Sequence, residues 1–404
     1  MGLALLRRRR PTRASSVESV KDLGSADITR LYREEYAHAL NALGRFNLAI
    51  FGKTGTGKST LVNAIFGEDV AAVGTGRPVT TGLDYYVHPN GVLGIYDSRG
   101  FETGEAGDRI LAALEDIVDT ARKADAAEQI HAAWYTLRWS DRRFEDHQAG
   151  FVRRLQELGL PVLFVLTQVP ANAQGQIHDE AIEFARYIAG LGLPLAADGR
   201  VFLTNAKADQ FLGTVVFGLQ ELLDATFDTI PEVAVAALSA AQQLDWGRKR
   251  QAAKKIITAS ASSALATGAT PIPFSDAAIL VPLQIGMIAR LTAAYGSRLA
   301  SAQLASLVGS LMLSSGATTA GRWMVSSLLR VVPGGQPAAM VISGTVAASM
   351  TTAMGWAWVA VLEKYLVNGD LSDVDSIRAV FVEEFKARFK LTGGKDRRAL
   401  PPGE

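Results

Sequence analysis

The run FGKTGTGKST at residues 51–60 constrains the fold of this chain more than any other stretch. It fits G-x-x-x-x-G-K-[S/T], follows an apolar, strand-like run (46–52) and precedes residues 59–67, which have the character of a helix. Glycines let such a loop turn backbone N–H groups toward phosphate oxygens, where the following helix presents its positive N-terminus. The spacing predicts a strand, a phosphate-binding loop and a helix; a glycine-rich turn that only joins strand to helix is the alternative.

Every residue of this loop is a candidate contact for a nucleotide. We expect Lys58 to lie beside the β- and γ-phosphates, and the Ser59 hydroxyl to bind Mg²⁺. The predicted nucleotide contacts within the loop are Gly52, Lys53, Thr54, Gly55, Thr56, Gly57, Lys58, Ser59 and Thr60.

Two downstream segments complete the predicted phosphate site. A glycine-containing loop within 74–87 supplies Thr80, the first choice for another Mg²⁺ contact, with Thr81 as the alternative. The apolar strand within 92–100 ends in D-x-x-G, where Asp97 would hold the metal through water and the Gly100 N–H would reach the γ-phosphate. The candidate catalytic groups are therefore Lys58, Thr80 and Gly100, and the candidate metal contacts are Ser59, Thr80 and Asp97.

Length and composition limit the class of protein. The chain has 404 residues, 48% of them apolar, so it is long enough for two or three domains with cores of their own. A formal net charge of +1 argues against a general nucleic-acid binder, and we expect no nucleic-acid partner. The absence of cysteine excludes disulfides and cysteine-based metal sites.

Strand-like and helix-like segments alternate from residue 45 to about residue 230. This alternation predicts an α/β domain with a doubly wound, mostly parallel sheet and the nucleotide at the carboxyl ends of its strands, followed by an all-α hydrophobic domain. The predicted organisation is a basic disordered tail (1–24), a nucleotide-binding domain with a leading helix (25–232), a basic connecting helix (233–260), the hydrophobic domain (261–367), and an amphipathic helix with a disordered tail (368–404).

The hydrophobic domain carries few charges: residues 256–362 contain a single acidic residue, Asp276, and four basic ones. Two uncharged stretches, 299–321 and 336–362, reach the length needed to span a bilayer, but they are rich in Ala, Gly, Ser and Thr. Small residues permit close helix packing, so the region either spans or dips into a bilayer or forms a tightly packed helical bundle. The amphipathic helix within 374–390 is expected to pack back on the protein.

The order of the phosphate loop, threonine loop and D-x-x-G resembles that of the translation-factor-related P-loop GTPases, especially the Era-like branch. The loop GKTGTGKS is similar to those of immunity-related, septin-like and chloroplast-import GTPases. The resemblance implies GTP and GDP as ligands, Mg²⁺ as cofactor, and GTP hydrolysis. Phe101 and Glu102 stand where Ras-type enzymes place a water-orienting glutamine, so hydrolysis is expected to be slow, or to be completed by a partner or by a second copy in a homodimer or self-assembly.

The residues that would choose the base depart from the GTPase pattern. N-K-x-D normally ends a later strand, yet after 160–166 this chain places Thr167, Gln168, Val169 and Pro170, without the aspartate that accepts from guanine. A further strand ends in a turn similar to S-A-K, whose alanine N–H contacts the guanine oxygen. GTP is favoured, with an ATPase or relaxed-specificity NTPase as the alternative. The predicted base contacts are Thr167, Gln168, Asn205, Ala206 and Lys207.

The second half of the chain resembles the hydrophobic domain of unknown function of YcjF-like proteins, which is also fused behind bacterial Era-like GTPase domains. The resemblance rests on PIP-x-x-D and a Q-x-x-M-I helix within 266–296, and on a P-G-G turn before a long small-residue helix within 328–365. It implies a nucleotide switch coupled to a hydrophobic module and little more. Together with the low charge of residues 256–362, it favours membrane association, so we expect the protein in the cytoplasm, associated with or inserted in the bacterial inner membrane, with membrane lipid as a partner. A soluble nucleotide-gated scaffold with a helical protein-docking domain is the alternative.

Overall fold

A computed structural model describes residues 25–67, 70, 75–80, 83–98, 104–123, 128–211, 213–267, 276–297, 299–314, 344–366 and 373–393. The predicted tail at 1–24 lies outside these residues. The chain divides into two compact units. The sheet unit comprises 39–252 and 293–298, and the helical unit takes the described residues within 1–38, 253–292 and 299–404.

Among the described residues, the sheet unit has seven strands in the order β2-β3-β4-β1-β5-β6-β7. Strands β4, β1, β5, β6 and β7 pair in parallel, while β2 and β3 form an antiparallel edge beside β4. The α/β fold with a mostly parallel sheet, predicted from the alternating pattern, is confirmed. The strands are β1 (Phe46–Phe51), β2 (Thr75–Thr80), β3 (Leu83–Val87), β4 (Leu93–Ser98), β5 (Ala132–Arg138), β6 (Val162–Thr167) and β7 (Val201–Leu203).

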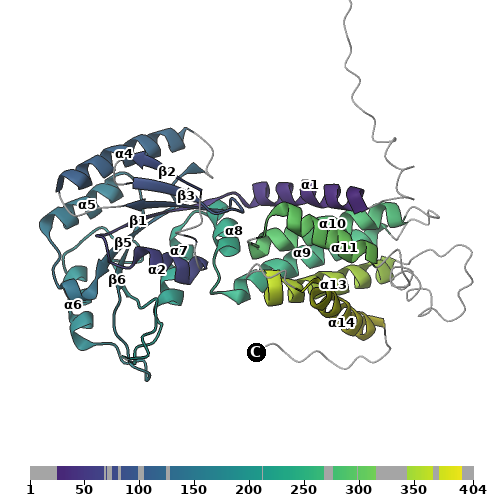
Figure 1. The fold of residues 1–404 in the computed structure, drawn as a ribbon. Coiled ribbons are helices and arrows are strands. Elements are labelled where there is room, and N and C mark those ends of the chain that lie inside the picture. Colours follow the sequence, from purple (N-terminus) through teal and green to yellow (C-terminus); the bar gives the residue numbers. More distant parts are fainter. Residues whose placement is uncertain are drawn as a thin grey trace, which may run out of the picture. The chain divides into compact units, whose positions relative to one another are not determined.

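Both faces of the sheet are buried beneath helices, and the strands alternate between two cores. Along β1, Ala49 and Phe51 enter the core under α4, α5 and α6, whereas Phe46, Leu48 and Ile50 enter the core under α2, α7 and α8. Figure 1 shows α4 and α5 on one side of the sheet and α2 and α7 on the other. These helices are α2 (Lys58–Phe66), α4 (Gly104–Arg122), α5 (Asp146–Glu157), α6 (Asp179–Ala189), α7 (Leu219–Thr229) and α8 (Glu232–Ala241).

The segment after α7 differs from the single connecting helix expected over 233–260. Pro231 is the N-cap of α8, whose buried Ala237 and Leu238 join the same core as α7. The next helix, α9 (Trp246–Thr267), begins only after a turn. The buried Gln242 organises this turn, because its Oε1 accepts from the N–H groups of Leu244 and Asp245, both at 2.7 Å. Side-chain hydrogen bonding of this kind breaks a helix that composition alone would continue.

Lys249, on the first turns of α9, is fully buried in the sheet unit. Its Nζ donates to Ala240 O at 2.8 Å and to Tyr295 O at 2.9 Å, which are carbonyls at the C-terminal ends of α8 and α10 (Asp276–Tyr295). Helix C-termini leave such carbonyls without helical partners, so Lys249 satisfies both. Burial lowers the pKa of Lys249 to about 7.

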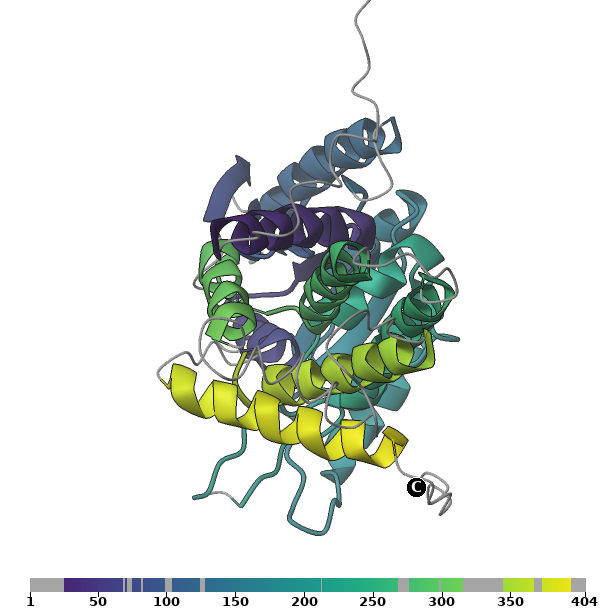
Figure 2. The same ribbon diagram turned by 90° about the vertical axis from the view of Figure 1, so that its right-hand side faces the viewer.

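The helical unit contains the first part of α1 (Ser25–Leu43), the remainder of α9, most of α10, and α11 (Ser301–Ser314), α13 (Gly344–Val361) and α14 (Val374–Gly393); a π-helical turn, Leu362–Leu366, follows α13. Helices α13 and α14 lie side by side (Figure 2). The rings of Phe381 of α14 and Trp358 of α13 pack in a T-shaped arrangement at a centroid distance of 6.3 Å, and Ile377 and Phe385 are buried as well. The prediction that the C-terminal amphipathic helix packs on the protein is confirmed.

Small residues allow α13 to pack closely inside the helical unit. A Cβ on Gly355 would lie 2.6 Å from Ile257 Cγ1, so a larger residue does not fit without movement. The buried Trp358 donates from Nε1 to Thr292 Oγ1 at 2.9 Å. Within the described residues, one helix, Gly344–Tyr365, is long and apolar enough to cross a membrane, and 56% of its apolar window is already buried by protein. The predicted stretches 299–321 and 336–362 are described only to residue 314 and only from residue 344, respectively.

Candidate nucleotide-binding site

The phosphate loop joins β1 to α2 at the carboxyl edge of the sheet. Gly52 has a φ of 146°, and a Cβ there would lie 2.2 Å from Thr136 Oγ1, so the position requires glycine. Gly57, with a φ of 88°, is the N-cap of α2. Both the N–H and the hydroxyl of the buried Thr56 donate to Lys53 O, at 3.3 and 2.9 Å, so Thr56 holds the loop in shape.

Lys58, the first residue of α2, folds back over the loop. Its Nζ donates to Gly52 O at 2.8 Å and to Lys53 O at 3.3 Å. Burial lowers the pKa of Lys58, and the Asp97 carboxylate opposes this by raising it. Lys58, Ser59 and Asp97 line one small cavity together with Tyr86 and apolar residues of α2, β1 and β4. The structure thus brings the Asp97 carboxylate beside Lys58 and Ser59, which precede it by 39 and 38 positions in the sequence.

The donor groups in this cavity suit a hard divalent cation. Mg²⁺ prefers oxygen ligands and is usually bound by one or two protein groups together with substrate phosphates and waters. The Ser59 hydroxyl and Asp97 carboxylate offer that set. Asp84, which sequence reasoning missed, is the direct cross-strand neighbour of Asp97 and adds negative charge beside it. The sequence signal for Asp84 was its place in the alternating, strand-like run 83–87.

Two other predicted groups fall partly or wholly outside the described residues. Thr80 ends β2, and its backbone pairs with Leu83, but its side chain is not among those described. Thr81 and Gly100 lie outside the described residues.

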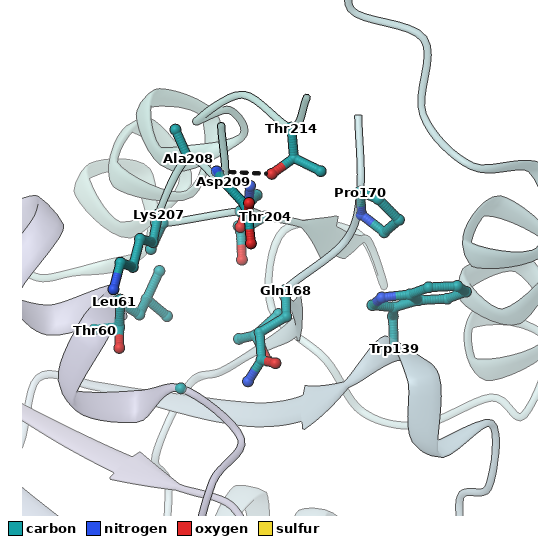
Figure 3. Close-up of a pocket in the computed structure, with 14 residues that line it drawn as sticks. Thr60, Leu61, Trp139, Gln168, Pro170, Thr204, Lys207, Ala208, Asp209 and Thr214 are labelled. Atoms are coloured by element: carbon teal, nitrogen blue, oxygen red, sulfur yellow. Dashed lines mark hydrogen bonds between the residues drawn. The ribbon is translucent and has the colours of Figure 1, made fainter. Parts of the chain in front are cut away.

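A second cavity, of about 450 Å³, opens beside the phosphate loop at the ends of β6 and β7. In Figure 3, Lys207 and Trp139 lie on opposite sides of Gln168, with Pro170 above Trp139. The cavity is lined by Gly57, Thr60, Leu61, Trp139, Thr167, Gln168, Pro170, Thr204, Asn205, Ala206, Lys207, Ala208, Asp209 and Thr214. All five predicted base contacts are among these residues, which also include Trp139, Pro170, Asp209 and Thr214, none of them predicted.

Thr167 and Gln168, which line the second cavity, are hydrogen-bonded to the phosphate loop. The buried Thr167 hydroxyl donates to Thr56 O. Gln168 has a φ of 56°, in the left-handed region, and its Nε2 donates to Gly55 O at 2.9 Å. Both side chains are therefore hydrogen-bonded to the loop that would hold the phosphates. The position expected to carry the guanine-selecting aspartate holds Pro170, which has no side-chain acceptor.

Two family models match separate parts of the chain. Residues 47–168 match the model described as "50S ribosome-binding GTPase", and residues 235–378 match the one described as "Domain of unknown function (DUF697)". The chain carries a P-loop GTPase domain followed by a DUF697 domain. The GTPase match runs from β1 through the phosphate loop to the end of β6, and the DUF697 match from α8 into α14.

Curated relatives are similar to parts of this chain. A GTPase Der of Nitrobacter winogradskyi is 29% identical over 191 residues, which are 47% of this chain and 36% of the relative. A GTPase Der of Nitrobacter hamburgensis is 32% identical over 190 residues, 46% of this chain and 35% of the relative. The small ribosomal subunit biogenesis GTPase RsgA of Methanosarcina acetivorans is 32% identical over 107 residues, 23% and 29% of the two chains. The chain thus spans about a third of the length of these relatives.

Solved structures similar to this chain include Toc33 from Arabidopsis thaliana, with 14% identity and a TM-score of 0.32 over 54% of this chain and 96% of that one. Another is the bacterial selenocysteine-specific elongation factor EF-Sec, with 15% identity and a TM-score of 0.27 over 46% of this chain and 28% of that one. The family matches and curated relatives together support a GTP-binding GTPase domain.

Proposed function

We propose that this protein is a Mg²⁺-dependent nucleotide switch that binds GTP, hydrolyses it slowly, and couples the bound nucleotide to the state of its DUF697 domain. One observation carries the proposal: consecutive residues of the phosphate loop line two cavities, because Lys58 and Ser59 line a small one with Asp97, and Gly57 and Thr60 line a larger one at the ends of β6 and β7. The donor groups of the first suit a metal ion and phosphate oxygens, and the second has the size and lining of a site for a base.

In this proposal, water attacks the γ-phosphorus of GTP, the bond to the β-phosphate oxygen breaks, and GDP and phosphate leave. Lys58 stabilises the charge that develops on the β- and γ-phosphates. When bound, Mg²⁺ neutralises part of that charge, with Ser59 and Asp97 as the residues that would hold it. The sequence supplies no water-orienting glutamine at residues 101–102, which is why slow or partner-completed hydrolysis is proposed.

We propose further that the DUF697 domain associates with a membrane at the cytoplasmic face of the bacterial inner membrane. The low charge of residues 256–362 and the apolar helix Gly344–Tyr365 support this. The alternative, a folded domain that docks a protein, is supported by the hydrogen bond from Trp358 to Thr292 and by the packing of α14 on α13.

The proposal is tested by competition binding. We would measure the dissociation constants of the purified chain for GTP, GDP and ATP against a fluorescent nucleotide, with Mg²⁺ and with EDTA. A preference of at least tenfold for guanine nucleotides, about 1.4 kcal/mol, and weaker GTP binding without Mg²⁺ are expected. Equal or tighter binding of ATP would favour the ATPase or relaxed-specificity alternative, which the absence of a carboxylate at Pro170 supports.

Lys58→Ala is expected to weaken GTP binding at least tenfold, since it removes the ammonium that lies over the loop. Lys254→Ala, which removes an exposed lysine from α9, is the matched control and should bind like the wild type. Retention of wild-type affinity by Lys58→Ala would contradict the assignment of the phosphate site.

A further inference from the structure

The cavity at the ends of β6 and β7, which we propose holds the base, lacks a side-chain acceptor for guanine at Pro170. Guanine offers two adjacent donors, its N1–H and its exocyclic amine, whereas adenine has an acceptor at N1. A protein that selects guanine therefore needs a pair of acceptors in one plane, and a carboxylate supplies it. Pro170 has no such group, and the side chain of Gln168 is bonded to Gly55 O.

One wall of the cavity is formed by a hairpin-like segment, of which residues 205–211 and 213–217 are described. Two isolated bridges close it, between Asn205 and Phe217 and between Asp209 and Thr214. The loop is tied to the segment after β6, because Val215 N donates to Ala171 O at 3.2 Å. These bonds hold the loop against the residue that follows Pro170.

Asp209 is held in a defined position at this wall. Its N–H donates to Thr214 Oγ1 at 3.0 Å, and Thr214 N donates to Asp209 O at 2.9 Å. Its Oδ1 accepts from Phe211 N at 2.9 Å, which fixes the carboxylate relative to the backbone. Figure 3 shows Asp209 and Thr214 joined at the same end of the cavity.

Among the described residues that line the cavity, Asp209 alone carries a carboxylate. A carboxylate has two oxygens with about four acceptor positions in one plane, which is the arrangement that the two donors of guanine require. We propose that Asp209 selects the base: its carboxylate accepts from the N1–H and exocyclic amine of guanine, from the loop after β7 instead of the loop after β6. This inference rests on the proposed function, because it assumes that the cavity holds a guanine nucleotide.

The test exchanges the donors and acceptors of both partners. Asp209→Asn keeps an oxygen for Phe211 N but presents an amide donor to the base. Xanthine carries a carbonyl oxygen where guanine carries its amine, so the amide fits xanthine. Dissociation constants for GTP, XTP and ATP with Mg²⁺ would be measured for the wild type, for Asp209→Asn, and for the exposed control Asp228→Asn on α7. We expect Asp209→Asn to bind GTP at least tenfold more weakly and XTP at least tenfold more tightly, while the control binds like the wild type.

A wild-type measurement makes the test independent of the folding of the variant. Inosine triphosphate lacks the exocyclic amine, and a site built to accept from that amine rejects the analogue. The wild type is expected to bind it at least fivefold more weakly than GTP. A GTP-selective wild type that binds inosine triphosphate equally well, or a folded Asp209→Asn with an unchanged ratio of GTP to XTP affinity, would overturn the role of Asp209 alone. A wild type that prefers ATP would overturn the proposed function together with this inference.

Discussion

Lys249 makes the free energy of unfolding of the sheet unit depend on pH. Burial lowers its pKa from the ordinary 10.5 to about 7 in the folded chain. Between these values the unfolded chain binds a proton that the folded chain releases, so the contribution of Lys249 to stability rises as the pH rises from 7 to 9. Below pH 7 both states hold the proton, and the cost of burying the charge is at its greatest.

The measurement is the difference in free energy of unfolding between the wild type and Lys249→Met, by urea denaturation from pH 6 to pH 9. We expect the difference to shift in favour of the wild type by about 2 kcal/mol between pH 7 and pH 9 and to change little between pH 6 and pH 7. Lys254→Met, at an exposed position of the same helix, should show no such shift. A pH-independent difference for Lys249→Met would contradict the lowered pKa.

Some residues that line the two cavities can be predicted from their spacing in sequence motifs, whereas others are placed there only by contacts between distant segments. Lys58, Ser59 and Asp97 were found from sequence because each occupies a fixed place relative to a strand end, and the structure brings them into one cavity. Asp209 was missed because it lines the cavity only through the bridge to Thr214 and the bond from Val215 to Ala171. No local pattern encodes these long-range pairings.

At the scale of single elements, Gly355 sets how closely α13 packs in the helical unit. A Cβ there would lie 2.6 Å from Ile257 Cγ1 and 3.2 Å from Met287 Sδ. Gly355→Ala is expected to lower the free energy of unfolding by about 1–2 kcal/mol, because overpacking outweighs the gain in helix propensity. Gly150→Ala, in the exposed and open surroundings of α5, should instead raise it by about 0.5–1 kcal/mol.

Chemical denaturation followed by circular dichroism compares the two glycine variants directly. Opposite signs are expected, since both exchanges gain the same helix propensity and only Gly355→Ala meets neighbouring side chains. If both variants were stabilised, α13 would not be packed against Ile257 in solution.

Helices and strands were predicted well where the hydrophobic periodicity is strong, and poorly where the hydrogen bonds of a single side chain end a helix. The strands and helices around the phosphate loop follow from alternating apolar residues, and each lies near its predicted place. The break between α8 and α9 was missed, because composition is helical throughout and only the bonds of Gln242 to Leu244 and Asp245 interrupt it. Likewise, the predicted basic connecting helix contains Lys249, which is buried.

At the scale of the whole molecule, the compact units are interleaved along the chain. Composition suggested domains in simple succession, whereas the sheet unit includes 293–298 in addition to 39–252, and the helical unit includes described residues before position 39. The hydrogen bond from Lys249 Nζ to Tyr295 O is one reason that residues 293–298 belong to the sheet unit, since it joins residues 46 positions apart in the sequence. A change in composition along the chain indicates a change in the kind of surface. It does not predict that a later segment, such as 293–298, packs with the earlier unit.

The packing of α13 determines how the proposed membrane association should respond to extraction. Thr351, Met354 and Trp358 are buried by protein, and Trp358 is bonded to Thr292, so α13 would lose these contacts if it entered a bilayer alone. We therefore expect the full chain to float with anionic vesicles, more so with a non-hydrolysable GTP analogue than with GDP, and to be released by alkaline carbonate. Lys58→Ala should float without any nucleotide dependence. Resistance to carbonate, with release only by detergent, would indicate that α13 inserts, and no flotation in any nucleotide state would favour the protein-docking alternative.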